Sequence, residues 1–324
     1  MHRPSWWPKR PPILSSAHGS SIVSSHPDSL SGQPLENPAL GFGATLLSLL
    51  LFSLMDANVK WLGADYPTTQ IMFFRCMVAL LPIIVIVYLR GGPGVLRTAQ
   101  KRLHLLRSLL GVGAMGFAFY AFSLMPLAEA ISIMHTAPLF MTALSVLILG
   151  EKVGRHRWSA IGVGFVGMLI VMRPGAEMFA SGSLYMLLAA LLIGCTTIIV
   201  RFLGRIDDPI CITFYFTLSG VVVSLAGILL QGWRQPSLPD LALLCLVGLC
   251  GGMAQYLMTL SYRHLAVAIL APLRYLTIVF GGLFGYLIWD ELPDVYSLAG
   301  ILVIVASGLY TLHREMIVRA WASR

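Results

Sequence analysis

The sequence predicts an all-α polytopic membrane protein with ten transmembrane helices in two inverted five-helix repeats. Three observations support this prediction. Hydrophobic residues make up 57% of the chain and charged residues only 11%, whereas soluble domains carry about 25% charged residues. Apolar runs of membrane-spanning length follow one another along the chain, and short motifs from its first half recur in its second half.

The expected spans follow from the lengths of the apolar runs, because a helix needs about 20 residues to cross a bilayer. Short connections with turn residues separate the runs, including GGPG at 91–94 and QPSLPD at 235–240. The ten expected spans are 39–62, 68–89, 104–124, 127–149, 157–172, 183–203, 209–230, 239–261, 265–288 and 295–312.

The basic residues predict the orientation of the chain. Sixteen of the 22 Lys and Arg residues lie in the two ends and in the connections on the same side of the membrane, and three lie on the opposite side. Cytoplasmic loops carry the excess of positive charge, so both ends are predicted to be cytoplasmic. Because the charges sit in these loops, the net charge of +8 does not indicate nucleic-acid binding.

Both ends of the chain are expected to lie outside the membrane-embedded part. Residues 1–36 are rich in Ser and Pro and are predicted to form a disordered cytoplasmic tail. Residues 314–324 are predicted to form a second cytoplasmic tail. The two repeats are expected to occupy residues 37–175 and 181–313.

Matching motifs define these repeats. VKWLG at 59–63 recurs as VRFLG at 200–204, FFR at 73–75 falls on FYF at 214–216, and ILGEKVG at 148–154 falls on IWDELPD at 288–294. The shift is 140 or 141 residues each time. Because each repeat holds five spans, the second is expected to be inverted in the membrane. Inverted repeats are typical of secondary transporters that bind their substrate near the midplane.

Three stretches carry a resemblance to a known family. They are PLAEAISIMHTAPLFMTALSVLILGEKVGRHRWSAIGVGFVGMLIVMRPG (126–175), APLRYLTIVFGGLFGYLIWDELPD (271–294), and MDANVKWLG (55–63) followed by QIMFFR (70–75). The sequence resembles the EamA family of the drug/metabolite transporter superfamily. The last stretch resembles a bacterial subgroup that includes proteins assigned to uptake of S-adenosylmethionine or riboflavin. The resemblance implies a ten-helix transporter of the bacterial inner membrane, with its fifth and tenth helices at the periphery.

Asp56 is an unexpected residue for a membrane span, because a charge at the bilayer centre costs about 2.5–3.5 kcal/mol or more. It lies six residues before the outer end of its helix, and Arg75 lies at a similar depth in the next helix. The two are expected to bind a charged or zwitterionic solute, or to relay a proton. The alternatives are a static ion pair between the helices and a contact of Asp56 with Lys60 on the same helix.

The repeat favours the functional interpretation of this pair. At the shift of 141 residues neither charge recurs, and Phe216 stands in the place of Arg75. Lys60, by contrast, recurs as Arg201. Lys60 is therefore expected to belong to the scaffold or to the membrane interface.

Further residues are expected at the substrate site. His135 lies near the depth of Asp56, faces Tyr275 in the repeat register, and could change protonation near neutral pH. Arg274 lies well inside the ninth span and could face an anionic group, and Tyr120 could supply aromatic surface. The structural alternatives are a neutral, hydrogen-bonded histidine and an arginine that binds carbonyl groups freed by a helix break.

Three other charged residues receive different assignments. Glu151 and Glu291 end the fourth and ninth spans, recur in both halves, and are predicted to fix loops or gate access. Arg107 lies near the inner end of the third span and is expected to extend to the membrane interface.

The combined prediction is a secondary active transporter that moves a small polar metabolite across the cytoplasmic membrane by alternating access. The resemblance suggests uptake of S-adenosylmethionine or riboflavin; export of a metabolite, amino acid or drug by the same fold is the alternative. An intramembrane lipid-modifying enzyme is an alternative of another class, but the chain contains no HExxH, GxSxG or P-loop motif. We therefore expect no enzyme, cofactor or metal. The expected partners are the bilayer and a small solute; proton coupling and a homodimer are compatible with the sequence.

Overall fold

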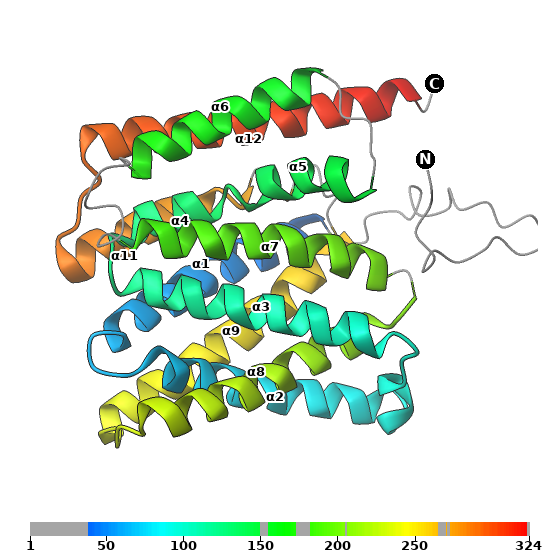
Figure 1. The fold of residues 1–324 in the computed structure, drawn as a ribbon, viewed down its shortest axis with the longest axis vertical. Helices are drawn as coiled ribbons and strands as arrows, with labels where there is room; N and C mark the ends of the chain where they lie inside the picture. The colour runs from blue at the N-terminus through cyan, green and yellow to red at the C-terminus, as the bar shows by residue number, and fades with distance from the viewer. Residues whose placement is uncertain are drawn as a thin grey trace, which may run out of the picture. The chain divides into compact units, whose positions relative to one another are not determined.

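The computed structural model describes residues 38–149, 155–172, 182–204, 206–264, 270 and 273–322. The predicted tail 1–36 and Glu151 lie outside these residues. Figure 1 labels the helices of the unit Asn37–Arg324. They are α1 (Pro38–Leu62), α2 (Thr68–Leu89), η2 (Gly92–Leu96), α3 (Lys101–Phe122), α4 (Leu127–Met134), α5 (Ala137–Leu149), α6 (Arg155–Met172), α7 (Ser183–Leu203), α8 (Pro209–Gln231), α9 (Leu238–His264), α11 (Leu276–Trp289) and α12 (Val295–Ala322).

These helices agree closely with the expected spans. In the part of the chain that the structure describes, seven helical segments are long and apolar enough to cross a membrane. Three shorter apolar helices, Ile161–Met172, Leu276–Trp289 and Val295–Tyr310, cover the remaining predicted spans. The protein is an all-α multi-pass membrane protein, and the number of ten spans stays a prediction. The expected tail after residue 313 continues as helix to Ala322.

The fourth expected span is interrupted, which corrects the prediction of one continuous helix. α4 and α5 meet at a turn formed by His135 and Thr136. Pro138 explains this break, because its ring lacks an amide proton and clashes with the carbonyl group four residues earlier. In the ninth expected span a turn at Arg274 and Tyr275 precedes α11. Both interruptions place polar side chains at helix junctions inside an apolar region.

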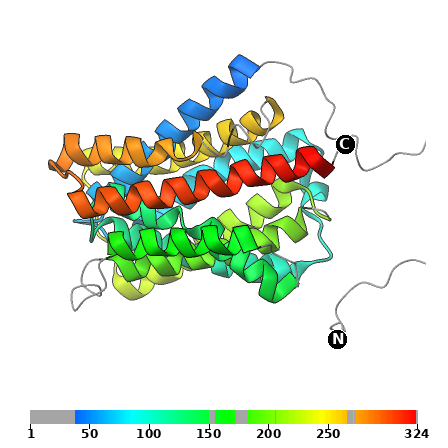
Figure 2. The ribbon, with the colours of Figure 1, turned by 90° about the horizontal axis from the view of Figure 1, so that it is seen from above.

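The helices of the two halves pack against one another in a reciprocal pattern. α1 lies along α9, and its counterpart α7 lies along α3 (Figure 1). α2 packs on its counterpart α8, and α6 packs on its counterpart α12. A twofold exchange of the halves produces this set of contacts. α6 and α12 run side by side at one edge of the bundle (Figures 1 and 2), the peripheral place expected for the fifth and tenth helices.

Small residues permit close packing between helices, as the GxxxG motif of α11 indicates. A methyl group added at Gly281 would collide with the side chain of Ile131 on α4. At Gly285 the added group would make ordinary contacts of 3.8 Å with Glu291. Gly281 is therefore the position of this motif at which α11 approaches another helix.

Candidate substrate-binding site

Asp56 of α1 is buried within the helical bundle. It is only 7% exposed, and among the described residues it forms no hydrogen bond or salt bridge. Arg75 of α2 is the neighbouring charge that acts on it electrostatically. The two residues therefore come together as expected, without a direct ion pair. The alternative contact with Lys60 is not formed, because the Lys60 ammonium group binds Glu291.

Arg75 reaches the surface of α9 at a glycine. A methyl group added at Gly251 would lie 3.5 Å from Nε and 3.6 Å from Cζ of Arg75, and 2.9 Å from Sδ of Met55. The Nε atom is buried and has no hydrogen-bond partner in the described part of the chain. The absence of a side chain at Gly251 thus leaves room for a guanidinium group that retains unused hydrogen-bonding capacity.

Arg107 of α3 is the residue for which the sequence expectation is wrong. Instead of extending to the interface, its Cζ lies 4.0 Å from the centroid of the Phe216 ring on α8. Its Nε and Nη1 atoms are buried without a hydrogen-bond partner among the described residues, and the group lies within electrostatic range of Arg75. The aromatic face attracts the guanidinium cation, which explains the inward orientation. The available sequence signal was Phe216, which takes the register position of Arg75.

Asp56, Arg75 and Arg107 form what we call the central charge cluster. Arg75 is the common neighbour, and α1, α2 and α3 each contribute one member. Guanidinium groups bind carboxylates through paired hydrogen bonds, and a carboxylate binds a cationic group. The cluster can therefore bind a solute that carries both charges. Nowhere in the described ranges do three His, Cys, Asp or Glu side chains gather as a metal site would require.

His135 and Tyr275 meet at the junction of the interrupted helices, as the repeat register predicts. Their ring centroids lie 5.3 Å apart. Nδ1 of His135 lies 2.8 Å from the carbonyl oxygen of Ile131, and Nε2 lies 3.2 Å from the carbonyl oxygen of Arg274 and from the Thr277 hydroxyl oxygen. A neutral ring can donate to one of these carbonyl groups, whereas a protonated ring can donate to both. The protonation of His135 therefore affects the contact between α4 and the start of α11.

Two expected site residues have other surroundings. The Arg274 side chain is exposed, and the backbone carbonyl group of this residue makes the contacts with His135 and Thr277. Tyr120 is 42% exposed, and its ring meets the ring of Tyr185 on α7 edge-to-face at 4.9 Å. A role of Arg274 or Tyr120 in substrate binding stays a prediction.

Lys60 and Glu291 form a salt bridge between the two halves of the chain. Nζ of Lys60 lies 2.5 Å from both carboxylate oxygens of Glu291 and 3.0 Å from the carbonyl oxygen of Met125. The ammonium group also lies 4.8 Å from the centroid of the Trp289 ring. These contacts connect the end of α1 with the segment that follows α11. They agree with a scaffold role for Lys60 and give Glu291 a partner that the sequence did not indicate.

A helical bundle that crosses the membrane many times and holds charges at its centre has the architecture of a membrane transporter. The comparisons with known proteins give the same class. The chain belongs to the EamA-like transporter family, whose sequence profile matches residues 39–173 and 180–312. The two matched segments correspond to the two repeats predicted from the sequence.

Several curated relatives are similar along most of their length. An S-adenosylmethionine uptake transporter of Rickettsia bellii (strain RML369-C) is 32% identical over 284 residues, covering 87% of this chain and 96% of the relative. A pseudopaline exporter of Pseudomonas aeruginosa is 30% identical, covering 81% and 92%. A riboflavin transporter of Rhizobium johnstonii is 29% identical, covering 84% and 90%. A solved crystal structure with 21% identity matches the fold with a TM-score of 0.59, covering 84% of this chain and 95% of that one.

Proposed function

We propose that this protein is a secondary transporter that moves a small zwitterionic metabolite by alternating access, with the central charge cluster as its binding site. The observation that carries the proposal is the buried Asp56 carboxylate beside Arg75, with Arg107 as the third member. Buried polar groups in folded proteins nearly always have partners. Charges inside a membrane are costly and generally mark a pathway for substrate or ions. A solute that binds here would provide the partners that the protein itself does not.

S-adenosylmethionine is the substrate that we propose first. It carries a sulfonium and an ammonium group that Asp56 could bind, and a carboxylate that Arg75 and Arg107 could bind. The similarity to uptake transporters of this compound supports the proposal. Riboflavin is the second candidate, because ring contacts such as that of Tyr120 with Tyr185 provide aromatic surface. Riboflavin is uncharged, however, and would leave the central charge cluster without ionic partners.

The proposed transport cycle uses the two halves of the chain. Both ends lie in the cytoplasm by the distribution of basic residues, so the salt bridge of Lys60 with Glu291 closes the outer side. The halves, as inverted repeats, rock about the central charge cluster. Glu151 would have the corresponding role on the inner side. Protonation of His135 would couple proton movement to this change. Export uses the same architecture, and one relative is an exporter; gradients decide the direction.

The substrate is best tested with a matched pair of ligands. S-adenosylhomocysteine lacks the methyl group and positive charge of S-adenosylmethionine. Ligand binding raises the melting temperature of the purified protein in proportion to occupancy. We expect S-adenosylmethionine to bind about tenfold more tightly, because a buried charge pair contributes about 1.4 kcal/mol or more. In Asp56→Asn this preference should disappear. Equal stabilisation by both ligands, or stabilisation by riboflavin alone, would refute this substrate assignment.

A further inference from the structure

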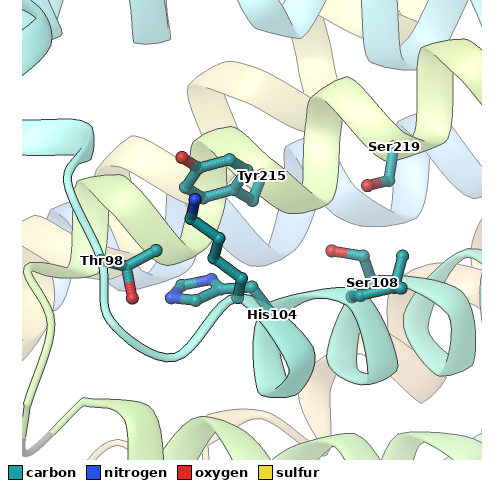
Figure 3. A pocket seen from close by; sticks show the side chains of 7 residues that line it. Thr98, His104, Ser108, Tyr215 and Ser219 are labelled. Carbon is teal, nitrogen blue, oxygen red and sulfur yellow. The ribbon is translucent and has the colours of Figure 1, made fainter.

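A pocket of about 240 Å³ lies between the beginning of α3 and the first half of α8 (Figure 3). None of the three members of the central charge cluster lines it. One side chain comes from the connection before α3, four from α3 and two from α8. The lining residues are Thr98, Lys101, His104, Leu105, Ser108, Tyr215 and Ser219.

Two deeply buried polar atoms in this pocket lack partners. His104 is 3% exposed, and its Nε2 lies 2.8 Å from Oδ2 of Asp207. Its Nδ1 is buried and has no hydrogen-bond partner in the described residues, and the same holds for Oγ of Ser108, which is 1% exposed. In Figure 3 the hydroxyl groups of Ser108 and Ser219 point toward one another from facing helices. Because buried polar atoms are rarely left unpaired, these atoms indicate a ligand.

The free groups of the pocket are mainly hydrogen-bond donors. Lys101 provides an ammonium group, and Ser108 and Ser219 provide hydroxyl groups. The nearby Asp207 carboxylate already accepts hydrogen bonds from Thr98, at 2.8 Å, and from His104. A site with one cation and several donors favours an anionic group with several acceptor oxygens. A phosphate group has this chemistry.

The pocket is continuous with apolar surface that extends along both helices. Leu105, which lines the pocket, is 58% exposed. Leu109, one turn further along α3, is 52% exposed, and Val222, one turn beyond Ser219 on α8, is 60% exposed. In a membrane protein such side chains face the acyl chains of lipids. A phospholipid has a phosphate group at one end and acyl chains that would follow this surface.

We propose that this pocket binds a phosphate group, and that the phosphate is the headgroup of an anionic phospholipid. Lys101, His104 and Ser108 hold the phosphate, and Leu105 and Leu109 contact an acyl chain. The distribution of basic residues places this end of α3 at the cytoplasmic leaflet, whose anionic lipids attract basic side chains. A soluble phosphate compound has the same chemistry, so the test must separate the two sources.

The test uses the full-length protein purified in detergent. Melting temperatures are measured while phosphatidylglycerol, phosphatidylcholine with the same acyl chains, or glycerol 3-phosphate is added. We expect phosphatidylglycerol to stabilise the protein at lower concentrations than the other two. Loss of a hydrogen bond to a charged group should weaken its binding about tenfold in Lys101→Gln and in Ser108→Ala. Because Oγ of Ser108 has no partner to lose, Ser108→Ala should melt no lower than the wild type without lipid.

Arg102→Gln is the matched control. Arg102 follows Lys101, is exposed, and does not line the pocket. Its loss removes the same charge from the same end of α3, and phosphatidylglycerol binding should change less than twofold. Equal weakening in the Lys101 and Arg102 variants, or no preference for phosphatidylglycerol over phosphatidylcholine, would overturn the lipid site. Equal stabilisation by glycerol 3-phosphate that requires Lys101 would support the phosphate site and overturn the lipid as its source.

Discussion

The ammonium group of Lys60 lies 2.5 Å from both carboxylate oxygens of Glu291, 231 residues later in the chain. Lys60 is 8% exposed and Glu291 is 28% exposed. The pair joins the end of α1 to the segment after α11, so a helix of one half is fixed to a loop of the other. In the proposed cycle this connection must break when the outer side opens.

Removal of one partner of this salt bridge should destabilise the closed state. Glu291→Gln leaves the Lys60 cation buried without its counter-ion, and breaking a fully buried pair costs about 3–5 kcal/mol. Because Glu291 is partly exposed, we expect about 1–3 kcal/mol here. A double-mutant cycle with Lys60→Met, followed by thermal unfolding, measures the coupling. Additive effects of the two substitutions would show that the contact contributes nothing.

Arg107→Lys should weaken substrate binding while the fold is retained. Lysine keeps the positive charge but loses the planar group that stacks on Phe216 and that could bind a carboxylate through two hydrogen bonds. We expect the KM for transport to rise about tenfold, corresponding to ~1.4 kcal/mol. Arg102→Lys, at the exposed beginning of the same helix, is the control. An unchanged KM in Arg107→Lys would remove Arg107 from the site.

Adjacent glycines in α9 provide a test of the room around Arg75. A methyl group at Gly251 would lie 2.9 Å from Sδ of Met55 and 3.5 Å from Nε of Arg75, whereas at Gly252 its nearest contacts are at 3.8 Å. Overpacking costs about 1–3 kcal/mol, so Gly251→Ala should lower substrate affinity about fivefold or more. Gly252→Ala should bind substrate like the wild type. Ligand titrations that give the same affinity for both variants would contradict this account.

The pH dependence of transport should depend on His135. Protonation allows its ring to donate to the carbonyl groups of both Ile131 and Arg274. His135→Gln cannot titrate, so transport rates measured between about pH 5 and pH 8 should vary less with pH than those of the wild type. His313→Gln changes an exposed histidine of α12 and should retain the wild-type profile. If the two variants have the same profile, His135 does not couple proton movement to transport.

The sequence predicts most of the helices and part of the site. Apolar runs indicate helix positions, and distance from a helix end indicates depth, which brought Asp56 and Arg75 together correctly. The repeat register predicted the contact of His135 with Tyr275, because it relates positions in the two halves. Depth alone does not define which way a side chain points around the helix axis, and this explains the error at Arg107.

Other features depend on how the halves pack. The partner of Lys60 could not be identified from the sequence, because its salt bridge with Glu291 forms only after α1 and α11 come together. The break at His135 and Thr136 was missed because its apolar surroundings read as one continuous run. Pro138 was the available local signal for that break.

The most direct test of the proposed function is counterflow of S-adenosylmethionine in liposomes that contain the purified protein. The wild type and the control Asp65→Asn, which changes an exposed loop residue, should exchange labelled substrate without ATP. Asp56→Asn should exchange it at least about tenfold more slowly. Its melting temperature should equal or exceed that of the wild type, because the substitution removes an unpaired buried charge. Wild-type exchange by Asp56→Asn, or a loss of exchange that only matches a loss of folded protein, would contradict the account.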